Sequence, residues 1–383
     1  MVSEALLNEV IEAFSFEGAL KQKGSYGSGH INDTFLLTFD IERMGAIDII
    51  LQRINTTVFT KPIELMENIA NVTRFLRDKI IDSGGDPERE TLNIIYTLEH
   101  KPYYVDSADG YWRAYKFITC ATSYDQVENA EDFYQSALAF GHFQSLLADY
   151  PVETLHETIQ GFHDTKARFE RFKEAAANDI CNRAKDVQAE IEFVLAHEDV
   201  ANVLTNWKLP IRVTHNDTKL NNVMIDDKTH KGICVIDLDT VMPGLAVNDF
   251  GDLIRFGTST GAEDETNLDK IESDMALFEI CAKGFIKGCG GKLTKAEIKA
   301  LPIGAKVMTF ECGMRFLTDY LDGDIYFKIH RKNHNLDRCR TQFKLLGICG
   351  FSNSGNSFPV PQYNVIPVFS DSAVCIGVFP IYI

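Results

Sequence analysis

The chain has 383 residues, a formal net charge of −17 and 45% hydrophobic residues. This length and apolar content are enough for a large core and favour two lobes or domains. The acidic balance argues against a nucleic-acid partner, which needs a basic face, and no apolar run is long enough to predict a membrane span. Nine cysteines lack any Cys-x-x-Cys spacing, so we expect reduced thiols in a cytoplasmic protein rather than a zinc site or disulfides.

The first third of the sequence is predicted to be rich in β-strands after one N-terminal helix. Ser3 is expected to cap that helix, and the segment has neither the basic region nor the cleavage site of a signal peptide. Residues 23–39 indicate two strands joined by a Gly-rich turn, and residues 47–55 indicate another strand. Residues 100–118 are predicted to form a hairpin that turns at 107–110.

Helices are predicted after Pro62 and through most of the rest of the chain. Pro62 is typical of the first helical position, and apolar residues follow it at helical spacing. Further helices are expected at 131–149, 162–177 and 184–204, and again from about 245 to 344. The predicted fold class is therefore α+β, with a small β-rich N-lobe at 1–119 and a large, mainly helical C-lobe at 120–344.

Residues 345–383 differ in composition from the rest of the chain. They carry a single charged residue, Asp371, whereas charged residues make up 24% of the whole sequence. An appended strand pair, a poorly ordered tail and a non-native C-terminus are three open interpretations. We assign this segment no function.

Residues 214–244 concentrate polar side chains around a predicted β-hairpin. Two apolar runs flank a polar turn, with Asp217 and Asn222 just before the hairpin and Asp237 and Asp239 at its end. Because a hairpin brings its two ends together, these four side chains are expected to converge. If the second strand continues, Asp239 points to the same side as Asp237.

Such a group of side chains suits phosphoryl transfer from ATP, which needs few protein groups. Asp217 is the candidate base that accepts the proton of the attacking hydroxyl, and Lys219 is close enough in sequence to reach the γ-phosphate. Asn222 and Asp237 offer the hard oxygen ligands that Mg²⁺ prefers. Asp239 is expected to bind a second Mg²⁺ or to orient the ligands of the first.

The order His215-Asn216-Asp217, four residues, Asn222 and then Asp237 matches the protein-kinase pattern, and His215 is expected to brace the loop. At the end of the hairpin the metal-site aspartate begins Asp237-Leu238-Asp239 rather than Asp-Phe-Gly, and Ala-Pro-Glu is absent. The chain more closely resembles the aminoglycoside phosphotransferase and choline kinase group. Over residues 15–344, the stretches THNDTKLNNVM, VIDLDTVMPG, NDFGDLIRFG and FHDTKARFERF resemble the N-acetylhexosamine 1-kinases.

This resemblance implies a bilobal protein-kinase-like fold and ATP- and Mg²⁺-dependent phosphorylation of an N-acetylhexosamine at its anomeric hydroxyl. The implied partners are ATP and a small sugar, without nucleic acid or membrane. The anomer and the oligomeric state stay open. Two rival functions are a kinase for choline, ethanolamine or an aminoglycoside, which the acidic balance favours slightly, and a nucleotide-binding pseudokinase.

Three features of the N-lobe are candidates for nucleotide binding. Glycines in the first turn let the backbone approach phosphate oxygens. The resemblance implies that the third strand supplies a cation to the α- and β-phosphates, and a carboxylate on the helix after Pro62 is expected to hold this cation. The candidates are Gly27 and Gly29 for the turn, Arg53 or Gln52 for the strand, and Glu67 or Glu64 for the helix.

The sugar-binding candidates come from the resemblance and from side-chain chemistry. His30 and Asp33 lie beside the Gly-rich turn, where they can contact sugar hydroxyls. Arg315 can donate to sugar oxygens or to an acetamido carbonyl, and the ring of Tyr326 can cover an apolar sugar face. The resemblance implies that Asp249 braces the loop that carries Asp217, with helix capping as the alternative.

Overall fold

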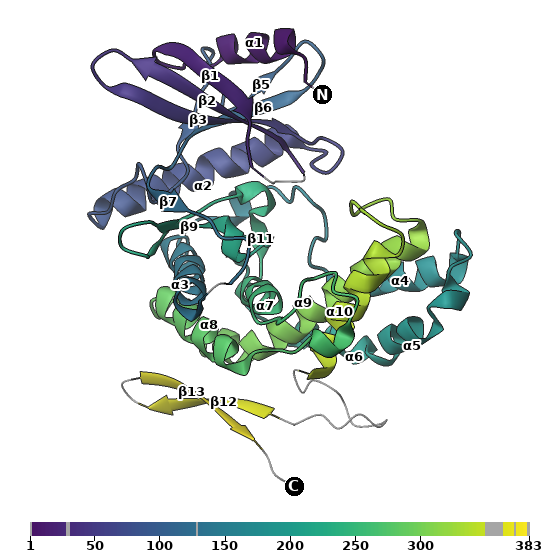
Figure 1. Ribbon diagram of the computed structural model, residues 1–383. Helices are drawn as coiled ribbons and strands as arrows, with labels where there is room; N and C mark the ends of the chain where they lie inside the picture. Colours follow the sequence, from purple (N-terminus) through teal and green to yellow (C-terminus); the bar gives the residue numbers. More distant parts are fainter. Residues whose placement is uncertain (1, 28–30, 128, 349–362, 371–372, 381–383) are drawn as a thin grey trace. The chain divides into compact units, whose positions relative to one another are not determined.

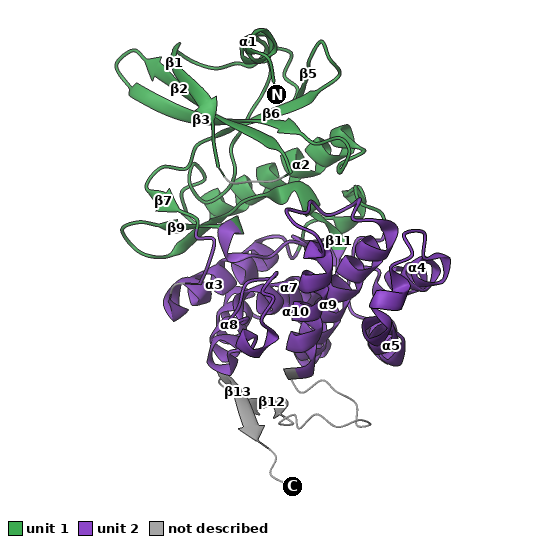
Figure 2. Ribbon diagram, turned by 45° about the vertical axis from the view of Figure 1, so that its right-hand side comes forward, with its two compact units in different colours: residues 1–123, 149–160, 222–243 green, residues 124–148, 161–221, 244–383 purple. Residues whose placement is uncertain are grey.

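The computed structural model describes residues 2–27, 31–127, 129–348, 363–370 and 373–380 (Figure 1). The chain forms two compact units (Figure 2): unit 1 contains residues 1–123, 149–160 and 222–243, and unit 2 contains the remainder. Both units combine separate stretches of chain, whereas the sequence suggests one division near residue 120. Side-chain hydrogen bonds explain part of this, because Asn68 donates to the carbonyl oxygens of His156 (2.8 Å) and Val241 (3.1 Å) within unit 1.

An antiparallel six-stranded sheet forms the body of unit 1, in the order β1-β2-β3-β6-β4 with β5 beside β6. Helix α1 (Glu4–Ala13) is capped by Ser3 as predicted, and its Leu7 and Val10 pack on one face of the sheet against Leu51 and Trp112. Helix α2 (Pro62–Asp82) lies along the other face (Figure 1). The strands are β1 (Ala19–Ser25), β2 (Asp33–Ile41), β3 (Gly45–Ile54), β4 (Ile94–Ile95), β5 (Tyr104–Val105) and β6 (Tyr111–Lys116).

The predicted hairpin in the 214–244 segment is confirmed. Strands β9 (Val223–Asp226) and β10 (Gly232–Val235) pair antiparallel, and β7 (Ala121–Thr122) adds a third strand beside β9. The short strand β11 (Met242–Gly244) follows. This hairpin belongs to unit 1, where its first strand, β9, pairs with β7 at the end of the N-terminal third of the chain.

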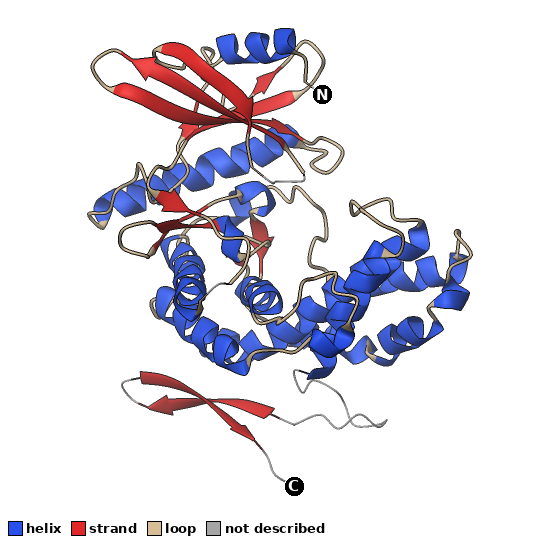
Figure 3. Cartoon of the chain, viewed as in Figure 1, coloured by secondary structure: helices blue, strands red, loops and turns tan. Residues whose placement is uncertain are grey.

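Unit 2 is mainly helical (Figure 3). Helices α7 and α9 can approach closely because Gly251 has no side chain. A Cβ atom at this position would lie 2.3 Å from the carbonyl oxygen of Gly304. The elements are α3 (Ala130–Leu146), α4 (Thr165–Asn178), α5 (Gln188–Ala196), α6 (Glu198–Asn202), β8 (Arg212–Thr214), α7 (Ala246–Gly257), α8 (Met275–Gly288), α9 (Lys295–Asp322), α10 (His334–Ile348), β12 (Tyr363–Ser370) and β13 (Ala373–Pro380). Short 3₁₀ helices occur at Val152–Thr154, Ala184–Asp186, Val203–Asn206, Leu220–Asn222, Leu238–Thr240 and Leu268–Lys270. The predicted α+β fold class, β-rich first and helical afterwards, is confirmed.

The single helix expected at 184–204 is wrong, because the structure divides it into two short helices with 3₁₀ turns. At the junction, the ring Nδ1 of His197 lies 2.7 Å from the carbonyl oxygen of Phe193. That oxygen would accept the next α-helical bond, and the backbone amide of His197 donates to Val194 instead. A local side-chain bond therefore competes with the helix and ends it.

The C-terminal segment contains a strand pair, which was one of the three interpretations. Strands β12 and β13 pair antiparallel over their full length. Helix α10 also runs past residue 344, with Leu345 and Leu346 buried, so the start of this segment belongs to the helical core. Within the described ranges, no helix is both long and apolar enough to span a bilayer. Free thiols are found at Cys120, Cys181, Cys234, Cys281, Cys289, Cys312 and Cys339.

Candidate functional site

The loop after β8 presents the candidate base. In this loop the Nζ atom of Lys219 lies 2.9 Å from a carboxylate oxygen of Asp217, and both side chains are partly exposed. Burial works to raise the pKa of Asp217, but the positive charge and hydrogen bond of Lys219, together with His215 and Arg255, hold it below its ordinary value. The carboxylate is therefore ionised at neutral pH, as a proton acceptor must be.

Asp249 holds the backbone of this loop from helix α7. Its two carboxylate oxygens accept hydrogen bonds from the backbone amides of His215 (2.9 Å) and Asn216 (2.8 Å), and Gln144 donates to the same group. The ring of His215 is fully buried against Phe140. Asn216 has a left-handed backbone (φ 64°), so these bonds fix an unfavourable conformation just before Asp217.

A second support reaches the same loop from helix α9. His163 lies between two acceptors, with Nδ1 2.8 Å from Glu311 and Nε2 3.2 Å from the carbonyl oxygen of Asn216. Thr165 donates to the other oxygen of Glu311. Burial opposes ionisation of Glu311, but His163 and Arg315 keep its pKa below the ordinary value. The sequence analysis did not identify this bridge, although FHDTKARFERF contains two of its members.

Arg315 lies one turn after Glu311 on α9, among aromatic rings. Its guanidinium is 5.1 Å from the ring centroid of Phe162, 5.8 Å from that of Tyr326 and 5.5 Å from that of Phe327. Tyr326 is 53% exposed and is therefore accessible to a ligand. The structure thus brings the two sugar-binding candidates Arg315 and Tyr326 together in unit 2.

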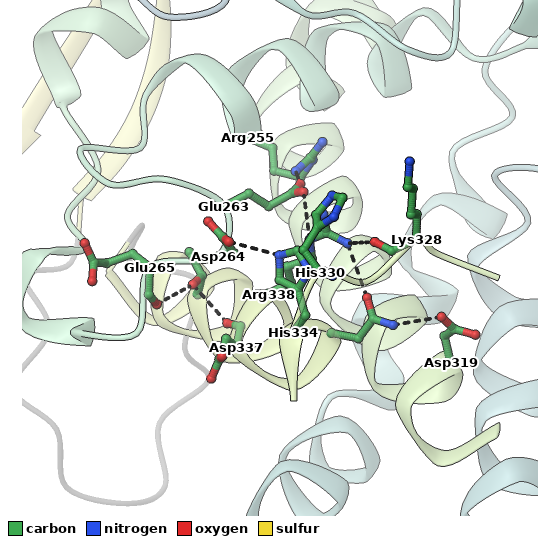
Figure 4. A network of polar contacts seen from close by, with 12 residues as sticks. Arg255, Glu263, Asp264, Glu265, Asp319, Lys328, His330, His334, Asp337 and Arg338 are labelled. Carbon is green, nitrogen blue, oxygen red and sulfur yellow. Dashed lines mark hydrogen bonds and ion pairs between the residues drawn. The ribbon is translucent and has the colours of Figure 1, made fainter. Parts of the chain in front are cut away.

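Asp319 fixes the loop that carries Tyr326. Its carboxylate accepts hydrogen bonds from the backbone amides of Ile325 (2.9 Å), Tyr326 (2.8 Å) and Phe327 (2.9 Å), and Asn335 donates to it as well. Asp319 lies at one end of a polar network (Figure 4) that also includes Asp264, His334 and Arg338. The aromatic side chains near Arg315 are therefore positioned by a buried carboxylate on α9 itself.

In unit 1 the hairpin brings Asn222 and Asp237 close together. The backbone amide of Ile236 donates to the carbonyl oxygen of Asn222 (2.9 Å), and Val235 pairs with Val223. The expected extended strand through Asp239 is wrong, because Asp237 has a left-handed backbone and the next three residues form a 3₁₀ turn. The alternation of side chains along a β-strand therefore does not determine where the Asp239 side chain points.

Asp239 forms a buried ion pair with Arg113 of β6, and Asn32 also donates to it (2.8 Å). Burial disfavours the charged form of Arg113, yet Asp239 raises its pKa above the ordinary value. Asn32 also accepts a hydrogen bond from the backbone amide of Asn55. Arg113 is not among the residues predicted from the sequence. The one feature that could have indicated its role is a charge inside the apolar strand YWRAYK.

The register of β3 separates its two candidates for the phosphate cation. Arg53 pairs with Trp112 and so lies on the sheet face covered by α1, near Asp106 and Gly110. Gln52 lies on the opposite face and accepts a hydrogen bond from Arg113 (3.0 Å). The cation on the Asp239 face is therefore Arg113, and this geometry does not favour Arg53.

The remaining predicted site residues of unit 1 lie on helix α2, in the first turn and at the start of β2. Glu67 pairs with His156 and Glu64 with Lys61, so neither holds Arg53 here. Gly27 has φ 78°, a conformation that favours glycine in a tight turn. The exposed Asp33 begins β2 opposite Arg53. Two further candidates, Gly29 and His30, lie outside the described residues.

The donors in unit 1 fit a magnesium ion bound together with ATP. Among the described residues, no three His, Cys, Asp or Glu side chains form a preformed metal centre. Asn222 and Asp237 supply one amide and one carboxylate, which suits a metal that keeps waters and takes its remaining ligands from phosphates. The residues present therefore fit a nucleotide-bound Mg²⁺ better than a metal held by protein alone.

Comparisons with known proteins concern the family and the fold of the chain. A model of the phosphotransferase enzyme family (APH) matches residues 26–273. An aminoglycoside phosphotransferase from Alicyclobacillus acidocaldarius is 13% identical with a TM-score of 0.56, covering 89% of this chain and 91% of that one. Amicoumacin kinase, in complex with AMP-PNP, Ca²⁺ and Ami, is 11% identical with a TM-score of 0.55, covering 90% and 93%. A microcompartment-associated aminopropanol kinase is 12% identical with a TM-score of 0.51, covering 90% and 94%, and at such identities the likeness concerns the fold.

Proposed function

The chain belongs to the phosphotransferase enzyme family, and we propose that it uses ATP and Mg²⁺ to phosphorylate an N-acetylhexosamine at its C1 hydroxyl. The choice of the acceptor site rests on one observation. The bridge from Glu311 through His163 to the carbonyl of Asn216 joins the helix of Arg315 to the loop of Asp217 within one unit. The sugar itself is inferred from the motifs that resemble N-acetylhexosamine 1-kinases.

Each residue has a role in this reaction. Asp217 accepts the proton as the C1 oxygen forms its bond to the γ-phosphorus and the bond from that phosphorus to the β-phosphate oxygen breaks. Lys219 is available to balance charge on the transferring group. Asn222 and Asp237 would hold Mg²⁺, which neutralises charge on the β- and γ-phosphates when bound.

The acceptor is held from unit 2. Arg315 donates to a sugar oxygen or to the acetamido carbonyl, and Tyr326 covers an apolar face of the ring. Asp249 and His163 keep the loop of Asp217 in place from two sides. A general base must lie within hydrogen-bond reach of the hydroxyl, so these supports govern the rate by position.

An ADP-release assay with a panel of acceptors tests this function. We expect turnover with N-acetylglucosamine or N-acetylgalactosamine, and little with choline, ethanolamine or kanamycin. Asp217→Asn is the matched control, and it should lower turnover by about 10²–10⁴-fold, which is the usual effect of losing a placed general base. Release of ADP with choline alone would point to an amino-alcohol kinase, and no release with any acceptor would point to a pseudokinase.

A further inference from the structure

We propose that Arg168 forms a second recognition residue beside Arg315, so that the acceptor subsite takes an uncharged or anionic, oxygen-rich group and rejects cationic acceptors. This inference rests on the proposed function, because it places the acceptor in unit 2 near Asp217. It goes further by naming the charge class of the substrate and a residue that enforces it. The argument depends on where the two arginines lie and on which carboxylates are available to them.

Both guanidinium groups meet at Phe162. The Nη2 atom of Arg168 donates to the carbonyl oxygen of Phe162 (3.3 Å), while the guanidinium of Arg315 faces the ring of the same residue (5.1 Å). Burial and then the positive charge of Arg315 lower the pKa of Arg168 below its ordinary value. Two positive charges therefore share one small region of unit 2.

Neither arginine forms a close ion pair among the described residues, although the charge of Glu311 acts on both at longer range. In the part of the chain that the structure describes, Arg113, Arg212 and Arg255 each contact a carboxylate, whereas Arg168 and Arg315 contact none within 4.0 Å. The Nε atom of Arg168 is buried without any hydrogen-bond partner. Buried donors without partners are costly, and in a protein of net charge −17 unpaired arginines are unexpected.

Glu311, the carboxylate that acts most strongly on Arg168, already has other partners at short range. One oxygen of Glu311 lies 2.8 Å from His163, and the other accepts a hydrogen bond from Thr165. Three aromatic rings lie around the guanidinium of Arg315, and a guanidinium in such cation–π contacts still carries N–H groups that can donate. This region therefore offers donors and positive charge, which match hydroxyl, carbonyl and carboxylate oxygens and repel an ammonium group.

Glucose and glucosamine are a matched pair of acceptors for the test, because they differ by a hydroxyl in place of an ammonium group. The wild-type enzyme should prefer glucose by at least about tenfold in kcat/KM. Arg168→Gln should reduce this preference toward parity and raise the KM for N-acetylglucosamine, with the KM for ATP unchanged. Arg168→Lys keeps the charge and should retain the preference while weakening both sugars.

The control is Arg171→Gln, one turn further along α4, where the arginine already pairs with Asp322. It should leave the preference unchanged, and melting temperatures exclude variants that fail to fold. Equal use of glucosamine and glucose by the wild type, or an unaltered preference in Arg168→Gln, would overturn the inference. If turnover is too slow to measure, calorimetric titrations with Mg²⁺ and AMP-PNP present give the affinities of the two sugars. Equal binding of both sugars, or binding of neither, would also overturn the inference.

Failure of the proposed function gives a different result. If N-acetylhexosamines are not phosphorylated but another neutral or acidic sugar is, and Arg168→Gln impairs that sugar, the inference stands and the proposed function does not. If choline, ethanolamine or kanamycin is the preferred acceptor, both fail.

Discussion

Lys219 lies 2.9 Å from Asp217 and helps to keep the carboxylate ionised. A base works only when it is deprotonated, so activity should fall as the pH drops through the pKa of Asp217. Lys219→Met removes the nearest positive charge, which raises this pKa. The acid limb of the kcat/KM profile should therefore move to higher pH, in addition to any loss of rate at the plateau.

A pH–rate profile of the variant against wild type checks this prediction. Lys228→Met, in the exposed β9–β10 turn, is the control and should leave the acid limb in place. An acid limb at the wild-type pH in Lys219→Met would mean that Asp217 is not the titrating base, or that Lys219 does not act on it.

The β6 strand is tied to the 3₁₀ turn after β10 by the ion pair of Arg113 and Asp239. Both side chains are buried, so removing one partner leaves an unpaired charge out of water. Asp239→Leu or Arg113→Met alone should lower the free energy of unfolding by about 3–5 kcal/mol. The double variant should lose much less than the sum of the two.

Urea titrations of the two single variants and the double variant measure this coupling. Lys101→Met breaks an exposed ion pair with Glu99 and should leave the free energy of unfolding nearly unchanged. Strict additivity of the two buried substitutions would show that the ion pair does not link these elements.

The loop after α9 depends on one carboxylate that accepts three backbone amides. Asp319→Asn replaces one acceptor oxygen by a donor, so at least one of these bonds is lost and Tyr326 shifts. A hydrogen bond to a charged group is worth about 1.5–3 kcal/mol, so the KM for the sugar should rise by roughly ten- to a hundredfold. The KM for ATP should stay the same.

Steady-state kinetics with each substrate varied in turn separates these effects. The matched control is Asp322→Asn, which lies one turn later on α9 and pairs with Arg171. A parallel rise in both KM values for Asp319→Asn would indicate general loosening of the helical unit rather than displacement of Tyr326.

At the scale of the whole molecule, local patterns predicted more than long-range ones. The hairpin at 223–235 and the spacing of Asp217 and Asn222 follow from neighbouring residues, so the sequence identified them. The pairing of Arg113 with Asp239 joins positions 126 residues apart, and no local pattern indicates it. Arg53 and Gln52 lie on opposite sheet faces, which strand register alone decides.

The net charge was a similarly weak guide to the substrate. A value of −17 describes the whole surface, whereas the region around Phe162 holds two arginines that the structure leaves without ion pairs. Recognition depends on the charges nearest the ligand, since salt screens exposed charges that are farther than about 8–10 Å away. The composition therefore favoured a cationic acceptor slightly, while the local geometry favours a neutral or anionic one.

The most direct test of the central claim is the identity of the phosphorylated product. Wild-type enzyme is incubated with Mg²⁺, ATP and N-acetylglucosamine or N-acetylgalactosamine, and the purified product is measured by ¹H–³¹P correlation NMR. The account predicts a phosphate signal coupled to the anomeric proton. A signal coupled to a proton at C3, C4 or C6, or no phosphorylated sugar although ADP is released with another acceptor, would contradict it.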